Sequence, residues 1–377
     1  MNTTSHVYFP NLDGLRFIAA FMVIVHHIEQ LKVYFGLQNN WDNEIIKSLG
    51  MLGVILFLVL SGFLISYLLF KEQDTTRDIG IKKFYLRRIL RIWPLYFFVI
   101  GLALFVLPYV TFLIYPGAVK LSMETKFYKA LPLYLLFLPN YVLVSIATIP
   151  FCSQTWSIGV EEQFYLIWPA LNKLFKNKLT IIISMIGIYL LIKYIVILKV
   201  VGAPQNSLLF QFWESMPIHF MAIGAFFAYV SFFETKFTSP LKSILYNRVF
   251  QMAIVALMLV MLIFGIKIMY FNLEIYAVFF AVMIINAATG PSNLFYLNFS
   301  FFKYLGKISY GLYMYHLICI VLTINILNRL NAESNNILIY ILSIFLTIVV
   351  ASISYHTLEK YFLNLKNRYT VIKTGSN

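Results

Sequence analysis

Long apolar runs alternate with short polar segments along almost the whole chain. A helix of about 20 apolar residues is long enough to cross the hydrocarbon core of a bilayer. About ten runs reach or approach that length, and we predict that each one is a membrane-spanning helix. Their approximate bounds are 15–35, 50–70, 92–113, 156–172, 179–199, 216–233, 249–268, 273–289, 308–328 and 336–357. The pattern predicts an all-α fold, a polytopic membrane helix bundle. We expect one integral-membrane domain over residues 1–377, with a core at about 8–362 and a tail at 363–377.

Residues 114–156 interrupt this pattern. Prolines recur through the segment, around a short apolar run at residues 131–138. The run is too short to cross a bilayer, so we expect an outer loop that contains a re-entrant or interfacial piece. No convincing internal repeat relates one half of the chain to the other, which argues against a transporter built from inverted halves.

The composition supports a membrane protein. Hydrophobic residues make up 61% of the chain and charged residues only 12%, and the mean hydropathy of +0.81 excludes a soluble domain. Cys152 and Cys319 offer neither a disulfide framework nor the spacing of a metal site, so we expect no metal. Polar residues follow the first Met, so we expect no cleavable signal peptide and a first spanning helix that serves for targeting.

The distribution of basic residues predicts the orientation. A net charge of +14 would be compatible with nucleic-acid binding, but the basic residues are spread over short loops between the apolar runs. If the runs alternate in direction, most of the 29 Lys and Arg residues fall on the side of the N-terminus. Because cytoplasmic loops are enriched in Lys and Arg, we place both termini in the cytoplasm and the chain in a bacterial inner membrane, with no nucleic-acid partner.

One apolar run carries two ionisable residues on the same face. Arg16 and His27 are eleven residues apart, which brings them to nearly the same side of a helix, about 16 Å apart along its axis. Ionisable groups within a membrane usually face the bundle interior or a water-filled cavity. The alternative is an arginine anchored among headgroups and a histidine hydrogen-bonded inside the bundle, and the spacing leaves both open.

Two further groups could support chemistry. Glu161 and Glu162 begin the fourth run at a depth similar to that of His27, and a carboxylate beside an imidazole forms a general base. The alternative is a first-turn pair that the helix dipole favours at the interface. His316 lies near the middle of the ninth run, where the sequence favours a histidine satisfied within the core over a catalytic one.

A third group could bind phosphate. Arg87, Arg88 and Arg91 lie at the cytoplasmic start of the third run, where guanidinium groups one turn apart could hold phosphate oxygens. Anchoring of the helix by basic residues is the alternative. No glycine-rich phosphate loop occurs, so a nucleotide-containing ligand would have to be held by such side chains.

These residues belong to short islands that recur in a fixed order along the chain. The islands are residues 12–16 with His27, Gly53 and Val54 with Phe57 and residues 61–65, Arg87 and Arg88 with Arg91 and Pro94, Trp156 and Ser157 with residues 160–165, Ile308 to Tyr310 with Tyr313 and His316, and Leu358 with Glu359. Together they resemble the membrane-bound acyltransferase family 3, whose members O-acylate cell-surface glycans. The resemblance implies ten spanning helices, an acyl-CoA donor bound from the cytoplasm, and transfer to a glycan hydroxyl on the far side.

The resemblance also implies roles for particular residues. His27 corresponds to the catalytic histidine and Arg16 to its partner, Arg88 and Arg91 correspond to the coenzyme-binding pair, and Glu161 or Glu162 to the essential acid. Further candidates within the islands are Asp13, Ser157, Tyr310 and His316. One departure is that Leu56 occupies the position where the family often has an acid, so no role is expected there. We also expect a stand-alone form, without the extracellular hydrolase-like domain fused to some members.

The resulting hypothesis is transfer of an acyl group, in the first place acetyl from acetyl-CoA, to a hydroxyl of an envelope glycan of the lipopolysaccharide or exopolysaccharide type. The expected partners are acyl-CoA, the glycan acceptor and the lipid bilayer. The sequence leaves the oligomeric state open, a homodimer included. Two alternatives remain, a carrier or flippase for an anionic or acylated small molecule and a structural subunit of an envelope assembly.

Overall fold

The computed structural model describes residues 6–116, 123–146, 149–197, 208–268, 270–291, 293–294, 296–333 and 335–374. Almost all of the elements in these ranges are helices. In the first half of the chain they are β1 (His6–Val7), α1 (Pro10–Tyr34), α2 (Glu44–Thr76), α3 (Ile81–Gly101), η1 (Leu102–Val106), η2 (Leu107–Tyr109), η3 (Thr111–Leu113), α4 (Met123–Leu135), α5 (Pro139–Ser145), η4 (Ser153–Thr155), α6 (Trp156–Leu174) and α7 (Lys178–Ile197). In the second half they are α8 (Leu208–Glu214), α9 (His219–Phe232), α10 (Thr238–Leu245), α11 (Arg248–Ile263), α12 (Asn272–Thr289), α13 (Ser300–Lys307), α14 (Ser309–Arg329), α15 (Asn336–Ser354), η5 (Tyr355–Glu359), α16 (Lys360–Asn367) and β2 (Lys373–Thr374).

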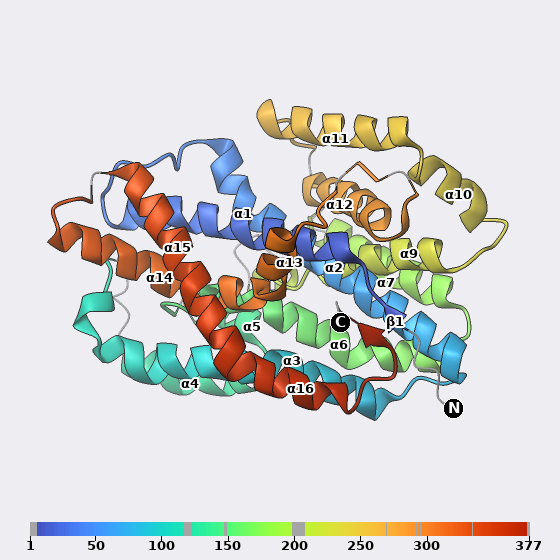
Figure 1. The fold of residues 1–377 in the computed structure, drawn as a ribbon, viewed down its shortest axis with the longest axis horizontal. Coiled ribbons are helices and arrows are strands. Elements are labelled where there is room, and N and C mark those ends of the chain that lie inside the picture. Colours follow the sequence, from blue (N-terminus) through green and yellow to red (C-terminus); the bar gives the residue numbers. More distant parts are fainter. Residues whose placement is uncertain are drawn as a thin grey trace.

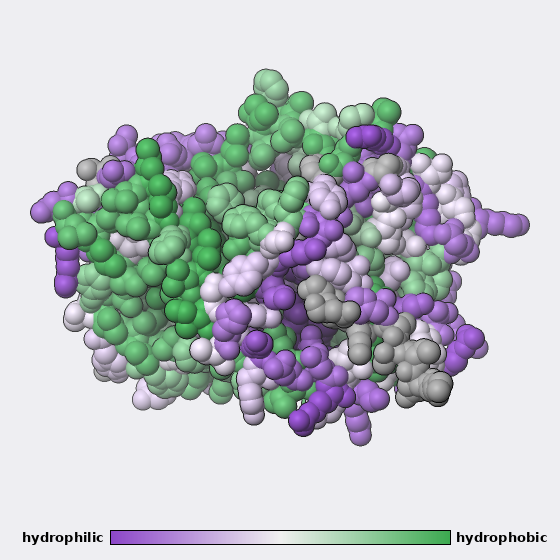
Figure 2. All heavy atoms as spheres, in the orientation of Figure 1, coloured by the Kyte–Doolittle hydropathy of each residue, from purple (hydrophilic) through white to green (hydrophobic). Residues whose placement is uncertain are grey.

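The helices form one bundle, which confirms the predicted all-α membrane fold. Figure 1 shows α11 and α12 on one side and α3 and α4 on the other, with α1, α2 and α14 between them. Apolar side chains cover a broad area over α14 and α15, and polar side chains gather around α16 and the chain ends (Figure 2). Ile341, Phe345 and Ile353 of α15 are each more than half exposed, as expected of residues that face lipid.

In the described part of the chain, eight helices are long and apolar enough to cross a membrane, and nine if the bent pair α10 and α11 is one span. That pair bends by 66° and corresponds to the seventh predicted run. The fourth predicted run corresponds to α6, which has 19 residues but is not among the eight. The reason is chemical, because α6 carries three charged residues, Glu161, Glu162 and Lys173, within its length.

The structure gives finer bounds for several predicted segments. The third run was expected at 92–113, but its helix begins at Ile81, so the arginines lie within α3. Residues 363–377 were expected to form a tail, yet the last long helix continues to Asn367 and β2 follows it. The expected loop at 114–156 contains α4, α5 and η4. Residues 198–199 of the fifth run lie outside the described residues.

Glycines bring the two most closely packed helices together. A β-carbon added to Gly62 of α2 would lie 2.0 Å from the carbonyl oxygen of Met221 in α9. A β-carbon on Gly224 of α9 would lie 2.0 Å from the carbonyl oxygen of Val59 in α2. Small residues that allow two backbones to touch are a common means of helix association in membranes, where lipid removes the usual hydrophobic driving force. The contact fixes α2 in the centre of the bundle.

The chain ends meet beside the last helix. His6 and Val7 of β1 pair in parallel with Lys373 and Thr374 of β2. Just before α16, the π-helical turn η5 widens the backbone over Tyr355–Glu359. Such turns insert an extra residue into a helix and are frequent at functional sites. Here the wide turn precedes the segment that carries Lys360 and Lys366.

We predict that Gly224→Ala lowers the melting temperature of the detergent-solubilised protein. The added methyl group would overlap the Val59 carbonyl, and overpacking of this kind costs about 1–3 kcal/mol. Gly187→Ala in α7 is the matched control, because no atom lies within 4 Å of its added β-carbon. Thermal unfolding of both variants measures the difference, and an unchanged melting temperature for Gly224→Ala would contradict the backbone contact.

Candidate active site

His27 lies at the wall of a cavity of about 520 Å³, which we call the histidine cavity. The cavity is lined by the second half of α1, from Val23 to Tyr34, by the start of α2, and by residues near η4. Its polar lining includes the side chains of Gln30, Gln154 and Trp156. Burial raises the pKa of the Tyr115 hydroxyl, which also lines this cavity, to about 12. The cavity therefore offers hydroxyl and amide groups and aromatic rings, together with the ammonium group of Lys47.

A second imidazole holds the ring of His27. The Nδ1 atom of His27 lies 3.0 Å from the carbonyl oxygen of Val23 and 3.1 Å from Nε2 of His316. His316 is fully buried in α14, and its own Nδ1 lies 2.7 Å from the carbonyl oxygen of Tyr313. The two rings are 4.8 Å apart between centroids.

These contacts determine the tautomers. A carbonyl oxygen only accepts hydrogen bonds, so Nδ1 of His316 carries the hydrogen and Nε2 of His316 accepts. Nδ1 of His27 then donates, either to His316 or to Val23, and Nε2 of His27 keeps its lone pair. A histidine with this tautomer, on the wall of a cavity, has the form that a general base requires.

The structure does not place the predicted glutamates beside His27. Glu161 accepts hydrogen bonds from Ser61 at 3.1 Å and from Tyr165 at 2.7 Å, and Glu162 accepts one from the indole of Trp93 at 3.2 Å. Equal depth in the membrane fixes the height of a residue on its helix but not the face on which it lies. The partner of the His27 ring is therefore His316, which sequence reasoning had left as either a core residue or a candidate.

Glu161 instead lines a second cavity of about 430 Å³, which we call the arginine cavity. It is lined by the start of α1, the middle of α2, α3, α6 and the segment after α15. Its basic side chains are Arg16, Arg88, Arg91, Lys307, Lys360 and Lys366, and its acidic side chains are Asp13, Glu161 and Glu359. Basic groups thus outnumber acidic groups in the lining, as a site for a polyanion requires.

Two of the basic side chains also contact other residues of the protein. Arg16 forms an ion pair with Asp13, which also accepts a hydrogen bond from Tyr8 at 3.0 Å. Arg88 lies 5.7 Å from the ring centroid of Tyr165, and its buried Nε has no hydrogen-bond partner within the described residues. A buried donor without a partner is costly, so a ligand oxygen at this position would be stabilising.

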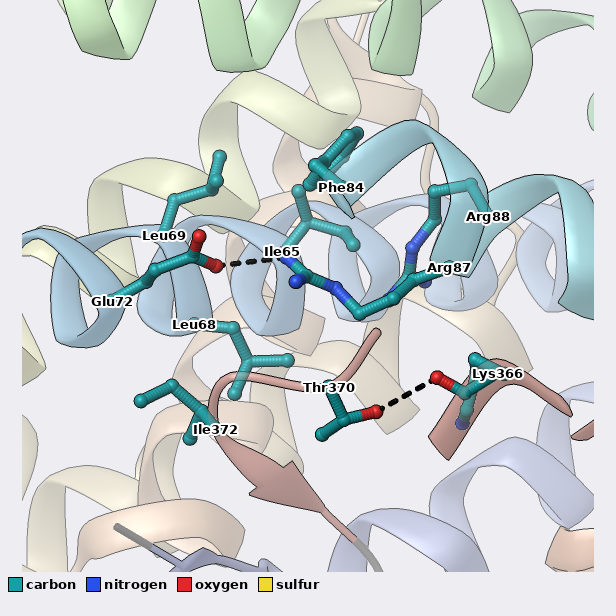
Figure 3. Close-up of a pocket in the computed structure, with 10 residues that line it drawn as sticks. All are labelled: Ile65, Leu68, Leu69, Glu72, Phe84, Arg87, Arg88, Lys366, Thr370 and Ile372. Atoms are coloured by element: carbon teal, nitrogen blue, oxygen red, sulfur yellow. Dashed lines mark hydrogen bonds and ion pairs between the residues drawn. The ribbon is translucent and has the colours of Figure 1, made fainter. Parts of the chain in front are cut away.

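Arg87 lies outside the arginine cavity, unlike Arg88 and Arg91. Its guanidinium forms an ion pair with Glu72 at 2.8 Å and donates to the carbonyl oxygen of Tyr369 at 3.2 Å. Figure 3 shows this pair at the wall of a small adjoining pocket, with Lys366 and Thr370 of the C-terminal segment opposite. Of the three arginines predicted to bind phosphate, two face the larger cavity and one holds α2 to α3.

The remaining predicted site residues lie between or beside the cavities. Ser157 and Tyr310 line the arginine cavity, and the Tyr310 hydroxyl donates to the carbonyl oxygen of Ile92 at 2.9 Å. Sequence reasoning missed Glu359 and the lysines at 307, 360 and 366 as lining residues. The lysines were taken as evidence of orientation alone, and their positions beside the ninth and tenth apolar runs were the available signal.

Within the described ranges, no group of three or more His, Cys, Asp and Glu side chains could hold a metal ion.

Comparison with known proteins identifies relatives over nearly the whole chain. A family profile described as an acyltransferase domain matches residues 9–356. The O-acetyltransferase OatA of Staphylococcus aureus is 29% identical over 376 residues, which cover 93% of this chain and 57% of that protein. The peptidoglycan O-acetyltransferase OatA of Listeria monocytogenes is 26% identical, over 94% of this chain and 56% of that protein. The chain therefore spans little more than half the length of these relatives. No solved structure matches it.

We predict that Glu72→Gln destabilises the protein, because it removes the charge that Arg87 pairs with. Glu72 is almost fully buried, and we expect a loss on the order of 2 kcal/mol. Asp78→Asn is the control, since its ion pair with Lys173 is exposed and such pairs contribute about 0–1 kcal/mol. Thermal unfolding of both variants tests this, and similar small losses at the two positions would show that the Glu72 pair is not structural.

Proposed function

The chain belongs to the acyltransferase family whose domain matches residues 9–356, and we propose that it transfers an acyl group, in the first place acetyl, from acyl-CoA to a hydroxyl of an envelope glycan. In this proposal the coenzyme binds in the arginine cavity and the glycan enters the histidine cavity. The observation that carries the proposal is that α1 presents Arg16 to the arginine cavity and His27 to the histidine cavity.

The arginine cavity supports the donor part of the proposal. The phosphates of coenzyme A would lie among Arg88, Arg91 and Lys366, where guanidinium forks and an ammonium group can donate to several oxygens. The unpartnered Nε of Arg88 would gain an acceptor. Arg16 and His27 are separated by about 16 Å along α1, a distance that an extended pantetheine arm can bridge.

The imidazole pair supports the chemical step. Nε2 of His27 would accept the proton of the glycan hydroxyl while its oxygen attacks the thioester carbonyl. The carbon–sulfur bond then breaks, the new ester remains on the glycan, and the sulfur leaves as a thiolate that takes the proton back from the imidazolium. His316 would accept the hydrogen bond from Nδ1 of His27 and keep the ring in the reactive tautomer and orientation.

An acyl-histidine intermediate is a variant of the same proposal. Nε2 of His27 would attack the thioester first, and the glycan hydroxyl would then displace the imidazole. Both routes use the same tautomer and the same two cavities, and both require the acyl carbon to reach His27 from the arginine cavity. Burst kinetics with limiting acceptor would separate them.

The histidine cavity supports a carbohydrate acceptor. Aromatic rings and amide side chains such as Trp156, Gln30 and Gln154 provide apolar faces and hydrogen-bonding groups. The name of the Listeria relative makes peptidoglycan the first acceptor to test. Lipopolysaccharide and exopolysaccharide remain the acceptors expected from the sequence. Mass spectrometry of each envelope glycan, with and without the protein, would identify the ester.

The predicted orientation of the chain in the membrane supports the proposal. The basic residues predict a cytoplasmic N-terminus, so in this proposal the arginine cavity would lie on the cytoplasmic side of an inner membrane, where acyl-CoA is found. The histidine cavity would then face the opposite side. A carrier is the competing proposal, and it would move an intact solute across sealed vesicles without consuming acyl-CoA.

We predict that His27→Ala lowers the transfer rate by at least 100-fold while the protein still inserts and folds, because the proton acceptor is lost. His316→Ala should lower kcat about 10- to 100-fold with little change in the KM for acyl-CoA, because the His27 ring loses its orienting partner. His356→Ala is the control for loss of an imidazole, since His356 is exposed in η5. Retained turnover in His27→Ala would overturn the proposed role.

We predict that Arg88→Gln and Arg91→Gln each weaken coenzyme A binding about 10-fold or more, because a charge-assisted hydrogen bond contributes about 1.5–3 kcal/mol. Calorimetry with the solubilised protein and free coenzyme A measures the affinity. Lys173→Gln removes a basic residue whose partner is Asp78 at the protein surface, and should leave the affinity unchanged. Equal weakening by all three variants would indicate a general charge effect instead of a binding site.

A further inference from the structure

The two cavities are lined by the same helices in the same order. On α1 the lining passes from Arg16 to Val23 and His27, and on α14 it passes from Tyr310 through Tyr313 to Leu317. The first residue of each series lines the arginine cavity and the last lines the histidine cavity. The α14 residues are three or four apart, so they form one face of that helix. The cavities are therefore two parts of one interrupted passage.

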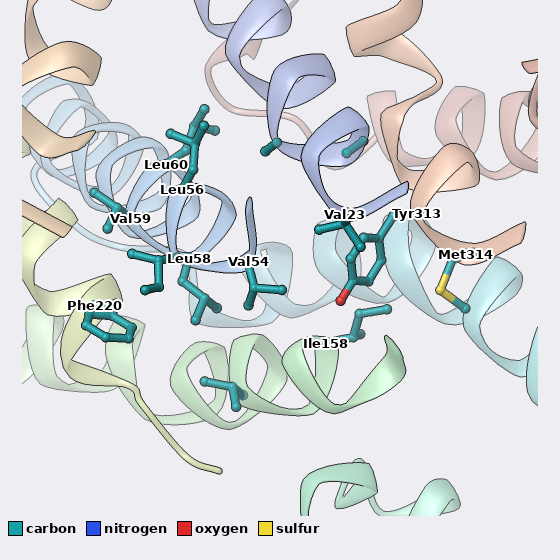
Figure 4. Close-up of a cluster of buried hydrophobic side chains, with 14 of the residues drawn as sticks. Val23, Val54, Leu56, Leu58, Val59, Leu60, Ile158, Phe220, Tyr313 and Met314 are labelled. Atoms are coloured by element: carbon teal, nitrogen blue, oxygen red, sulfur yellow. The ribbon is translucent and has the colours of Figure 1, made fainter. Parts of the chain in front are cut away.

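Tyr313 marks the interruption. Among the residues that the structure describes, it is the one side chain that lines both cavities. Its side chain is almost fully buried, and Figure 4 shows it beside Val23 of α1, with Ile158 of α6 nearby. The ring packs edge-on against Phe57 of α2 with centroids 5.6 Å apart. Side chains from four helices thus meet at this point.

Hydrogen bonds hold the Tyr313 ring in its place between the two cavities. Its hydroxyl donates to the carbonyl oxygen of Gln154 at 2.8 Å and lies 2.8 Å from the hydroxyl of Ser157. Ser157 can therefore donate to the Tyr313 oxygen, so the phenol is both donor and acceptor. The hydroxyl gains these bonds only while the ring lies across the passage.

We infer that Tyr313, with Ser157 and Phe57, is the movable barrier that separates the acyl donor from the acceptor and that the acyl arm must displace to reach His27. This inference rests on the proposed function for its substrates. The closed ring would keep acceptor-side water away from the thioester until the arm enters. Without the barrier, the oxygen of water would bond to the acyl carbon, the carbon–sulfur bond would break, and a carboxylic acid and free coenzyme A thiol would form.

The same residue links the barrier to the imidazole pair. The backbone carbonyl of Tyr313 accepts the hydrogen bond from Nδ1 of His316, and its ring centroid lies 5.9 Å from that of His316. A side-chain rotation about χ1 can open the passage without moving this carbonyl. The tautomer of His316 would therefore persist while the barrier opens.

The first test measures access and needs no catalysis. In a background of Cys152→Ala and Cys319→Ala, Gln30→Cys reports on the histidine cavity and Ser61→Cys reports on the arginine cavity. A compact cationic thiosulfonate reagent is added to sealed vesicles on the arginine-cavity side alone. We expect rapid labelling of Ser61→Cys and slow labelling of Gln30→Cys. Adding Tyr313→Ala should raise the labelling rate of Gln30→Cys at least 10-fold.

Tyr310→Ala is the matched control, because Tyr310 lies one turn away on α14 and lines only the arginine cavity within the described residues. It should leave the labelling of Gln30→Cys unchanged. Tyr313→Phe keeps the ring but loses both hydroxyl contacts, and should give an intermediate rate. If Tyr313→Ala does not fold, Tyr313→Leu provides a second shortened side chain. An unchanged labelling rate in a folded Tyr313→Ala or Tyr313→Leu protein would overturn the barrier.

The second test measures whether loss of the barrier allows water to hydrolyse acetyl-CoA. With acetyl-CoA and no glycan, release of free thiol should be at least 5-fold faster in Tyr313→Ala than in the unmodified protein, and Tyr310→Ala should show no such increase. Failure of the proposed function would abolish thiol release in every variant but would leave the labelling result intact. Faster labelling without faster thiol release would therefore support the barrier and count against acyl-CoA as the ligand. No increase in either measurement would overturn the barrier itself.

Discussion

The interior of a bilayer offers no water to an ionised side chain, so every charge within the bundle needs a protein partner or a hydrated cavity. This constraint explains where the charged groups of the chain lie. Glu29 and Lys32 are fully buried and pair at 2.5 Å, and the hydroxyl of Tyr340 donates to the same carboxylate at 2.7 Å. This pair is satisfied within the protein and joins α1 to α15. The basic residues of the arginine cavity, in contrast, outnumber the acidic residues of its lining, so this cluster is not balanced as the pair of Glu29 and Lys32 is.

The imidazole pair satisfies the same constraint in a different way. A neutral histidine orients its neighbour through a hydrogen bond but adds no negative charge to the membrane interior. A carboxylate in the place of His316 would stabilise an imidazolium more strongly, but its own burial would be more costly. Glu161 of α6 lies instead in the lining of the arginine cavity, where cations offset its burial. The separation of acidic groups from His27 is therefore consistent with the energetics of the bundle.

Much of the fold followed from the apolar pattern, because spanning helices have to be long and continuous. The shared face of Arg16 and His27 also followed from helical geometry within one element. The partner of His27 did not, because two helices that cross the same depth can rotate independently about their axes. Arg87 and Arg88 are adjacent in sequence, yet one pairs with Glu72 and the other faces the cavity. Adjacent residues of a helix point about 100° apart, and the tertiary positions of Glu72 and of the cavity decide which role each arginine takes.

The wide turn η5 has a consequence for everything that follows it. One residue more than an α-helix would use changes the rotational phase of α16 by about 100° relative to α15. That phase determines where Lys366, which is half-buried and lines the arginine cavity, points. Shortening this turn by a single residue would leave the composition of the segment nearly intact but turn the Lys366 ammonium group away from that cavity. The register of one turn, and not the number of lysines, thus determines how much positive charge the arginine cavity receives from α16.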